Sequence, residues 1–334
     1  MIMATHLLSL IIPVYNRPGE IEELLDSLTR QSGTNFEVIV VEDGSKETCR
    51  HVVDAFHDKL DVSYYYIPNG GPGNARNYGA GRSKGDYLIV LDSDCILPPG
   101  YIQAVNAELE ETGADAFGGP DKASDCFTDV QKAINYSMTS FFTTGGIRGG
   151  KKKVDKFYPR SFNMGIRKST YEALGGFSAM RFGEDIDFSI RLFKNGYKVC
   201  LFPSAWVYHK RRTDWRKFFR QVYNFGIARI NLYRKYPDSL KLVHLLPAAF
   251  TLGTLFFLVG SLFCLWSLLP LALFCLLIFI DSSVRNRSVK IGLLSVVASF
   301  IQLLGYGCGF LDAVWNRLIL KKGEFSAFQK TFYK

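Results

Sequence analysis

The sequence predicts an α/β fold, in which a parallel sheet with helices on both faces is followed by C-terminal transmembrane helices. Over the first ninety residues, strand-like and helix-like segments alternate, which is typical of β-α units. Hydrophobic residues make up 48% of the 334 residues, but charged residues are frequent up to about residue 241 and scarce from 242 to 280. We therefore expect a soluble part followed by a membrane part.

The strands of this sheet are expected at four short apolar runs: Leu7–Val14, Phe36–Val41, Val62–Ile67 and Asp86–Leu91. Helical segments separate them. The clearest carries an apolar stripe between Ile21 and Leu28, and another is expected over Asn74–Ser83. The apolar stretch near the N-terminus is interpreted as the buried first strand and not as a signal peptide.

Polar side chains follow the strands at the points where ligands bind in such sheets, beyond the carboxyl ends. Asn16 and Arg17 come after the first strand, and Asp43 comes after the second. Asp92 and Asp94 come after the fourth strand. Topology alone therefore predicts that these residues converge.

Two carboxylates lie two residues apart in Asp92-Ser93-Asp94. On a turn after a strand, both can reach one divalent cation, and hard oxygen ligands favour Mg²⁺ or Mn²⁺ together with phosphate oxygens. A solvated turn is the alternative, because Asp-x-Asp is common by chance.

Asp43 stands in the turn Glu42-Asp43-Gly44-Ser45. The acid can stabilise this turn through its own backbone, or it can accept hydrogen bonds from a base or ribose. The loop Gly70–Gly73 is a weak signal for phosphate binding, because it lacks the spacing of known phosphate-binding motifs.

Glu184 and Asp185 head a predicted helix, Gly183–Lys194, where acids stabilise the helix N-terminus. A carboxylate at this place can also take a proton from an acceptor hydroxyl. His209 follows an apolar stretch and is either a packed core histidine or a metal ligand.

The C-terminal third has the composition of a membrane region. Asp214–Tyr236 mixes aromatic and basic residues and is expected to lie as an amphipathic helix in the interface. Leu242–Ile280 has the length of two spans, with a turn near Trp266 and Pro270. Ile291–Leu311 is a weaker third span, because it contains polar residues and glycines.

The formal net charge is +9, and nine Lys or Arg residues lie between Lys210 and Lys235 against the single acid Asp214. A basic cluster beside an apolar run indicates anionic lipid on the cytoplasmic side, in preference to nucleic acid. Basic residues flank the predicted hairpin on both sides, which places both flanks inside. A third span would place Lys321 and Lys322 outside, which conflicts with the positive-inside rule unless that segment is re-entrant.

Cysteine spacing excludes a zinc site and a disulfide framework. The seven cysteines form no C-x-x-C pair, and three of them lie in the apolar tail. This usage fits a reducing compartment. The Gly- and Lys-rich stretch 142–160 is expected to be a mobile loop.

Seven motifs follow one another along the chain. They are Pro13-Val14-Tyr15-Asn16-Arg17, Val41-Glu42-Asp43-Gly44-Ser45, Ala75-Arg76-Asn77, Leu91-Asp92-Ser93-Asp94, Phe162-Asn163-Met164-Gly165-Ile166-Arg167, Gly175-Gly176-Phe177, and Gly183-Glu184-Asp185-Ile186-Asp187 with Arg191. In this order and spacing they resemble glycosyltransferase family 2, and the resemblance runs from about residue 8 to 212. Each motif is weak alone, but seven in register are specific.

The resemblance implies a GT-A fold, a Rossmann-like nucleotide-binding sheet merged with an acceptor-binding half. It implies that Pro13, Tyr15 and Asp43 line the nucleoside pocket, and that Arg76 lies near the base or diphosphate. Nucleotide-sugar binding is also expected of a further set: Arg17, Asp92 and Asn163.

The resemblance further implies a metal site and a base. Asp94 is expected to hold Mg²⁺ or Mn²⁺, with Asp92 and His209 as further ligands. Asp185 is expected to be the general base, and Glu184 its neighbour in acceptor binding. Breaking the anomeric bond leaves a charged nucleoside diphosphate, which the cation neutralises, and the anomeric configuration inverts.

The expected reaction moves one sugar from a nucleotide-diphosphate donor, with UDP-sugar the most frequent in the family, to a hydroxyl of a lipid-linked or cell-surface glycan. Processive family members carry Gln-x-x-Arg-Trp after the base, and 211–215 do not fit it. A polyprenyl-phosphate glycosyltransferase is the alternative, indicated by Leu97-Pro98-Pro99, with Arg148 and Lys151–Lys153 as cations for a phosphate acceptor. A non-catalytic nucleotide-sugar-binding scaffold is a second alternative.

The expected organisation has four parts. Residues 1–212 form the catalytic domain, 213–240 the basic amphipathic segment, 241–312 a membrane region of two to three helices, and 313–334 a tail. The protein is expected to be a multi-pass protein of the inner membrane with its catalytic domain in the cytoplasm.

Overall fold

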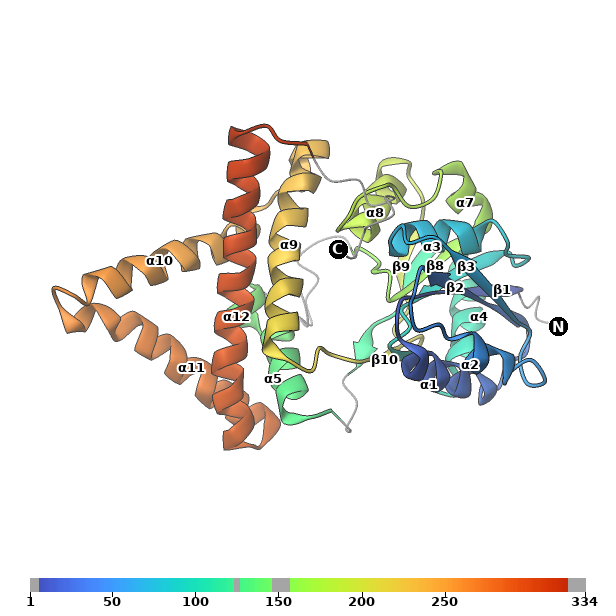
Figure 1. The fold of residues 1–334 in the computed structure, drawn as a ribbon, viewed down its shortest axis with the longest axis horizontal. Helices are drawn as coiled ribbons and strands as arrows, with labels where there is room; N and C mark the ends of the chain where they lie inside the picture. The colour runs from blue at the N-terminus through green and yellow to red at the C-terminus, as the bar shows by residue number, and fades with distance from the viewer. Residues whose placement is uncertain (1–5, 123–126, 146–156, 324–334) are drawn as a thin grey trace. The chain divides into compact units, whose positions relative to one another are not determined.

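The computed structural model describes residues 6–122, 127–145 and 157–323, and these residues form two compact units (Figure 1). The first unit contains residues 6–122 and 157–209, and the second contains 127–145 and 210–323. The four-part organisation expected from the sequence stays a prediction. Most of the predicted mobile loop, with Arg148 and Lys151–Lys153, lies outside the described residues.

A seven-stranded sheet forms the centre of the first unit. Its order is β3-β2-β1-β4-β8-β6-β9. The strands are β1 Leu8–Val14, β2 Phe36–Asp43, β3 Val62–Ile67, β4 Tyr87–Leu91, β6 Ala116–Gly118, β8 Asn163–Arg167 and β9 Val199–Leu201. The first four strands run parallel to one another, as expected, whereas β8 runs antiparallel to both β4 and β6.

Helices cover both faces of this sheet. Successive β1 residues point to opposite faces and therefore pack in two different cores. Leu10 and Ile12 pack in one core and Ile11 packs in another. The first core includes residues of α1 (Pro18–Thr29), α2 (Arg50–Asp54) and α4 (Tyr101–Thr112). The second includes residues of α3 (Pro72–Ala80), α7 (Lys168–Ala173) and α8 (Glu184–Lys194). This α/β arrangement confirms the predicted fold class.

A small three-stranded sheet, ordered β5-β10-β7, lies in the same unit. Its strands are β5 Cys95–Ile96, β10 Val207–His209 and β7 Asp121–Lys122. β5 pairs antiparallel with β10, and His209 lies opposite Cys95. The pairing brings the end of the first unit back to the turn that follows β4.

The second unit is helical. Its helices are α5 Asp129–Thr139, α6 Phe141–Thr144, α9 Trp215–Lys235, α10 Leu246–Gly260, α11 Leu269–Asn286 and α12 Val289–Ala313. α12 lies at the centre and contacts α5, α9, α10 and α11. α10 and α11 diverge from a tip formed by a 3₁₀ turn at Leu265–Leu268 (Figure 1).

Two helical stretches among the described residues have the length and hydropathy of a membrane span: Leu265–Asn286, with 22 residues, and Val289–Ile319, with 31. α10 is apolar but has only 15 residues, fewer than the roughly 20 that a span needs. The long apolar run therefore holds one helix of spanning length instead of the expected two, because the 3₁₀ turns at Leu242–His244 and Leu265–Leu268 leave only 15 residues for α10. The segment expected to be weakest is the longest of the three.

Candidate active site

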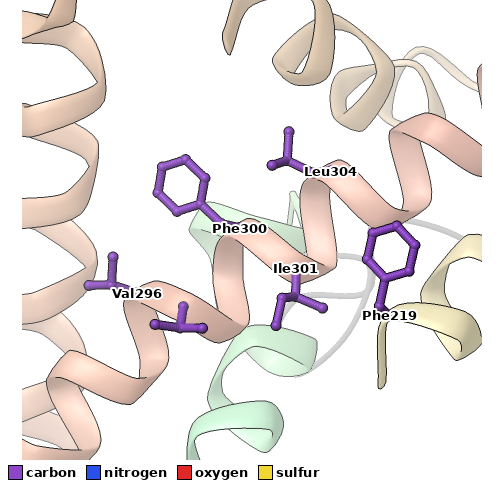
Figure 2. Close-up of a pocket in the computed structure, with 6 residues that line it drawn as sticks. Phe219, Val296, Phe300, Ile301 and Leu304 are labelled. Atoms are coloured by element: carbon purple, nitrogen blue, oxygen red, sulfur yellow. The ribbon is translucent and has the colours of Figure 1, made fainter. Parts of the chain in front are cut away.

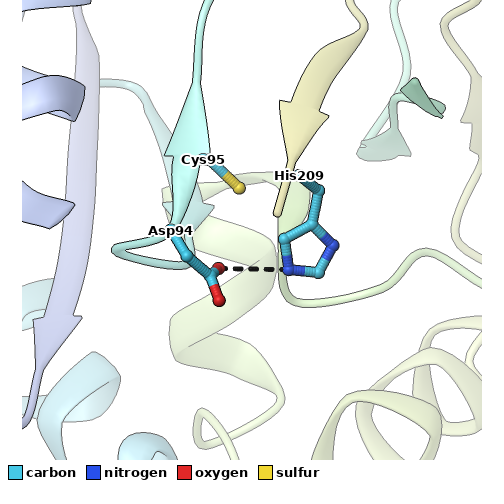
Figure 3. A group of neighbouring side chains, drawn as sticks. All are labelled: Asp94, Cys95 and His209. Atoms are coloured by element: carbon cyan, nitrogen blue, oxygen red, sulfur yellow. Dashed lines mark ion pairs between the residues drawn. The ribbon is translucent and has the colours of Figure 1, made fainter. Parts of the chain in front are cut away.

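Asp94 and His209 lie side by side although 114 residues of the chain separate them (Figure 3). Asp94 directly precedes β5 and His209 ends β10, so the pairing of these short strands sets their distance. His209 Nε2 is 3.1 Å from Asp94 Oδ1. The imidazole ring also stacks on Phe162, with 4.9 Å between ring centroids. The Asp94 side chain is only 8% exposed, so this contact is shielded from water.

Arg17 contacts the other oxygen of the same carboxylate. Its Nη1 lies 3.0 Å from Asp94 Oδ2 and 2.7 Å from Glu20 Oε2. The preceding residue, Asn16, has a φ of 52° and turns the chain after β1. This turn is held because the Asn16 amide nitrogen donates to Ser45 Oγ at 2.8 Å. The loop after β1 thus places a cation beside Asp94.

Arg76 on α3 is buried between two carboxylates. It donates to Asp92 Oδ1 at 2.9 Å and to Glu184 Oε1 at 2.8 Å. Phe177 covers the guanidinium, with 5.5 Å to the ring centroid. Burial lowers the pKa of Arg76, but the charges of Asp92 and Glu184 raise it by more, so the pKa lies above its ordinary value. The side chain therefore stays charged. Arg76 therefore couples the turn after β4 to the start of α8.

Glu184 and Asp185 open α8, as the sequence predicts. Burial raises the pKa of Glu184; Arg76 opposes this shift and Asp185 adds to it. Asp185 Oδ2 lies 3.2 Å from Arg160 Nε, and Asp185 Oδ1 accepts a hydrogen bond from the Ile186 amide. One oxygen of Asp185 thus faces a cation at the N-terminus of the helix.

The predicted residues therefore join into one chain of contacts. Arg17 contacts Asp94, Asp94 contacts His209, and His209 Nε2 lies 3.9 Å from Asp92 Oδ2. Asp92 contacts Arg76, and Arg76 contacts Glu184. Arg or His side chains alternate with carboxylates along this chain of contacts, and the two Arg charges offset those of the carboxylates beside them.

The donor atoms of Asp94 and His209 fit a divalent cation. Atoms of Asp94, Cys95 and His209 all lie within 4.8 Å of one another. The Cys95 thiol is buried and donates to the Phe162 carbonyl oxygen at 3.4 Å, and burial raises its pKa. The thiol proton is used in this hydrogen bond, which leaves a carboxylate oxygen and an imidazole nitrogen as the metal donors. This donor set suits Mg²⁺ or Mn²⁺ better than a soft metal.

Asp43 is not part of the chain of contacts that runs from Arg17 to Glu184. Its two carboxylate oxygens accept hydrogen bonds from the amides of Gly70 and Gly71, each at 2.8 Å. Burial raises the pKa of Asp43, and these two hydrogen bonds oppose the shift. The carboxylate thus holds the glycine loop, and Asn69 packs so closely that only glycine fits at Gly44, whose φ is 71°. The contribution of Asp43 to nucleoside binding stays a prediction.

Three further predicted residues also lie outside the chain of contacts. Asn163 is buried, accepts from the Tyr101 hydroxyl at 2.6 Å and donates to the Ala205 carbonyl at 2.8 Å. It thereby fixes β8 to the segment that leads into β10. Pro13 and Tyr15 are half-buried near the end of β1, on the edge that carries Arg17. Their roles in donor binding stay predictions.

Sequence reasoning missed Arg160 and Cys95. The sequence shows that the stretch 142–160 is basic, but no spacing in the sequence predicts that Arg160 contacts Asp185. The position of Cys95 beside Asp94 was visible, yet its burial follows only from the pairing of β5 with β10.

Comparisons with known proteins identify the family of this chain. The model of the family described as Glycosyl transferase family 2 matches residues 9–175, half of the chain. An uncharacterized glycosyltransferase of Haemophilus influenzae is 33% identical over 219 residues, 62% of this chain and 70% of that protein. A probable glycosyltransferase of Bacillus subtilis is 27% identical over 223 residues, 64% of this chain and 53% of that protein. This chain thus spans about half the length of the second relative.

A solved structure shares the fold over most of the chain. It is a mannosyltransferase from Pyrobaculum calidifontis in complex with GDP-Man and Mn²⁺, with a TM-score of 0.67 and 16% identity. The likeness covers 93% of this chain and 88% of that one, and it shows a common fold. Together with the family match, it confirms the GT-A fold predicted from the sequence. The chain belongs to glycosyltransferase family 2.

Proposed function

As a member of this family the protein is a transferase, and we propose that it moves one sugar from a nucleotide-diphosphate sugar to an acceptor hydroxyl with inversion. The proposed cofactor is Mg²⁺ or Mn²⁺, and UDP-sugar is the first donor to test. The observation that carries this proposal is the continuous contact of Arg17, Asp94, His209, Asp92, Arg76 and Glu184. These side chains converge beyond the strand ends, where α/β sheets bind nucleotides.

The metal is assigned to Asp94 and His209, with Asp92 as a further ligand. A bound divalent cation supplies positive charge that stabilises the departing diphosphate. Arg17 and Arg76 are proposed to support the same task, because they place two further guanidinium groups at this edge. Arg17 is half-buried and Arg76 is fully buried, so they act in a region of low dielectric.

Asp185 is proposed as the general base. As the acceptor oxygen bonds to the anomeric carbon, the bond from that carbon to the diphosphate oxygen breaks, and Asp185 takes the acceptor proton. Attack from the face opposite the leaving group inverts the anomeric configuration. Arg160 contacts the carboxylate at 3.2 Å and helps to hold it in place at the start of α8.

The acceptor is proposed to be a lipid-linked or cell-surface glycan, because the second unit has helices that suit a membrane. The proposed location is the inner membrane, with the first unit in the cytoplasm. The multi-pass anchor expected from the sequence is one arrangement of these helices.

The test is a product assay with detergent-purified protein. The protein is incubated with a panel of nucleotide sugars, Mn²⁺ and extracted membrane lipids, and the products are identified by mass spectrometry and NMR. We expect one donor to give a sugar joined to a hydroxyl with inverted configuration. A glycosyl monophosphate lipid would instead identify the polyprenyl-phosphate activity. Donor binding without any transfer or hydrolysis would contradict the proposed function and favour a scaffold.

A further inference from the structure

α12 has the length and hydropathy of a membrane span, yet much of it is covered by protein. Of its most apolar window, 44% is buried inside the fold, against 11% for the window in α11. Its buried residues include Ser295 and Ser299, and Ser295 bonds to Ser282 of α11 at 2.7 Å. The neighbours that cover α12 therefore decide where it can lie.

α9 and α12 pack so closely that their backbones touch. A Cβ added at Gly309 of α12 would lie 2.0 Å from the Tyr223 carbonyl oxygen of α9. A Cβ added at Gly226 of α9 would lie 2.2 Å from the Tyr306 carbonyl oxygen of α12. Clusters of apolar residues extend this contact toward both ends of the two helices. If α12 crossed a bilayer, α9 would have to cross beside it.

α9 is poorly suited to cross. It carries six cations: Arg216, Lys217, Arg220, Arg229, Arg234 and Lys235. Arg220 is exposed and stands more than a turn inside the helix, and Arg229 lies deeper still. Arginine side chains within the hydrocarbon are costly, so α9 belongs at the level of the lipid headgroups, where cations are favoured.

The hairpin of α10 and α11 has the opposite character. Residues 245–280 contain no charged side chain, and the tip is its most exposed part. Leu262 is 81% exposed, Phe263 88% and Trp266 79%. The two helices are about 22 and 27 Å long at 1.5 Å per residue, and both diverge from the tip toward α12 (Figure 1). An exposed apolar patch of this kind indicates contact with hydrocarbon.

The pair of α9 and α12 also has one apolar flank. A pocket of about 350 Å³ is lined by Phe219 of α9 and by residues of α12: Val296, Val297, Phe300, Ile301 and Leu304 (Figure 2). Phe300 also packs against Phe250 of α10 and Phe274 of α11. The apolar flank is thus continuous with the hairpin, as a helix at the boundary between headgroups and acyl chains requires.

We infer that the second unit anchors the protein from one face of a lipid bilayer, with the α10–α11 hairpin inserted and with α9 and α12 lying in the interface. The partner is an anionic lipid surface, because cations gather at both ends of the α9–α12 pair. Arg216, Arg285 and Arg287 mark one end. Arg234, Lys235, Lys321 and Lys322 mark the other end.

This arrangement removes a conflict in the charge distribution. A crossing α12 would place Lys321 and Lys322 on the face opposite to the basic start of α9, against the distribution of cations in membrane proteins. An interfacial α12 keeps all these cations on one face. The inference rests on the membrane association proposed above, but it is independent of the chemistry of the active site.

The sidedness of three exposed positions tests the inference. In the full-length chain with its cysteines replaced by alanine, the substitutions Lys217→Cys, Arg287→Cys and Lys322→Cys are made one at a time. Each variant is labelled with a membrane-impermeant maleimide in right-side-out and in inside-out vesicles. We expect all three positions to react from the same face, at least tenfold faster than from the other.

The alternative arrangements give different results. Crossing of α11 and α12 would place residue 287 opposite 217 and 322. Three crossings would place 322 opposite 217 and 287. Either pattern, or recovery of the protein in the soluble fraction, would overturn the inference.

A full-length chain with its native cysteines, fused at its C-terminus to green fluorescent protein or to alkaline phosphatase, provides a measurement that does not depend on the cysteine replacements. We expect fluorescence without phosphatase activity, and active phosphatase would overturn the inference. Because neither measurement needs turnover, an inactive enzyme with this sidedness would contradict only the proposed function.

Discussion

The first unit buries charged side chains, whereas the second exposes apolar ones. Arg76 is 3% exposed and Asp187 is fully buried, but Phe263 and Leu262 are 88% and 81% exposed. In the first unit each buried charge has partners that offset its desolvation. In the second unit, the exposed apolar residues lack such compensation in water, so a lipid environment accounts for them. The two units thus differ in the solvent for which their surfaces are suited.

The largest expected effect tests the chemistry of the first unit. Asp185→Asn removes the proposed base, and such a loss typically lowers kcat by 10²–10⁴-fold. Donor binding, measured by calorimetry, should be unchanged, because Asp185 acts on the acceptor. Glu172→Gln is the control, since Glu172 is exposed on the same unit. Normal turnover by Asp185→Asn would refute the assignment of the base.

The next effect tests the paired charges of the first unit. Arg76→Met leaves Asp92 and Glu184 without their shared cation. Removing one partner of a buried ion pair typically costs about 3–5 kcal/mol of folding free energy. Denaturant unfolding of the purified protein measures this loss, with the exposed Lys46→Met as the control. Equal stability of the two variants would mean that the charges are not coupled in solution.

A charge at the tip of the hairpin tests the solvent of the second unit. Phe263→Asp places a carboxylate at an apolar position that is 88% exposed. An acid deep in hydrocarbon costs about 3 kcal/mol, so the fraction of protein recovered with membranes should fall. The melting temperature in detergent should hardly change, because Phe263 packs little against the protein. Tyr66→Asp, at an exposed position of the first unit, should leave the membrane fraction unchanged.

The smallest effect tests the contact between α9 and α12. Gly309→Val introduces side-chain atoms where the Tyr223 carbonyl already lies, and overpacking of this kind costs about 1–3 kcal/mol. The melting temperature in detergent should therefore fall. Gly253→Val on α10 is the matched control, because a Cβ there meets nothing within 4 Å. A stable Gly309→Val variant would show that the two helices can move apart.

The sequence predicts the first unit well where patterns are local. β1 to β4 match the expected runs, because strands buried on both faces must be continuously apolar. The antiparallel direction of β8 could not be read, since strand direction depends on long-range connections. The contact of Asp94 with His209 depends on β5, a strand of two residues, which is too short to leave a pattern.

In the second unit, the sequence predicts apolar helices but not whether lipid or protein covers them. The glycines and polar residues of α12 weakened its prediction as a span. The structure uses Gly305 and Gly309 for contact with α9, and Gly307 for contact with α10. High hydropathy indicates that a helix is shielded from water, but either lipid or neighbouring helices can provide the shielding. Only the packing partners, such as the cationic α9, distinguish the two.

Metal-dependent donor binding is the most direct test of the proposed site. Calorimetric titration of the purified protein with the donor identified in the product assay is repeated with Mn²⁺ and with EDTA, for the native chain and for Asp94→Asn. We expect tight binding only for the native chain with Mn²⁺, and loss of the metal effect in an Asp94→Asn variant that still unfolds cooperatively. Equal affinity of the native chain in Mn²⁺ and in EDTA would contradict the metal site at Asp94 and His209.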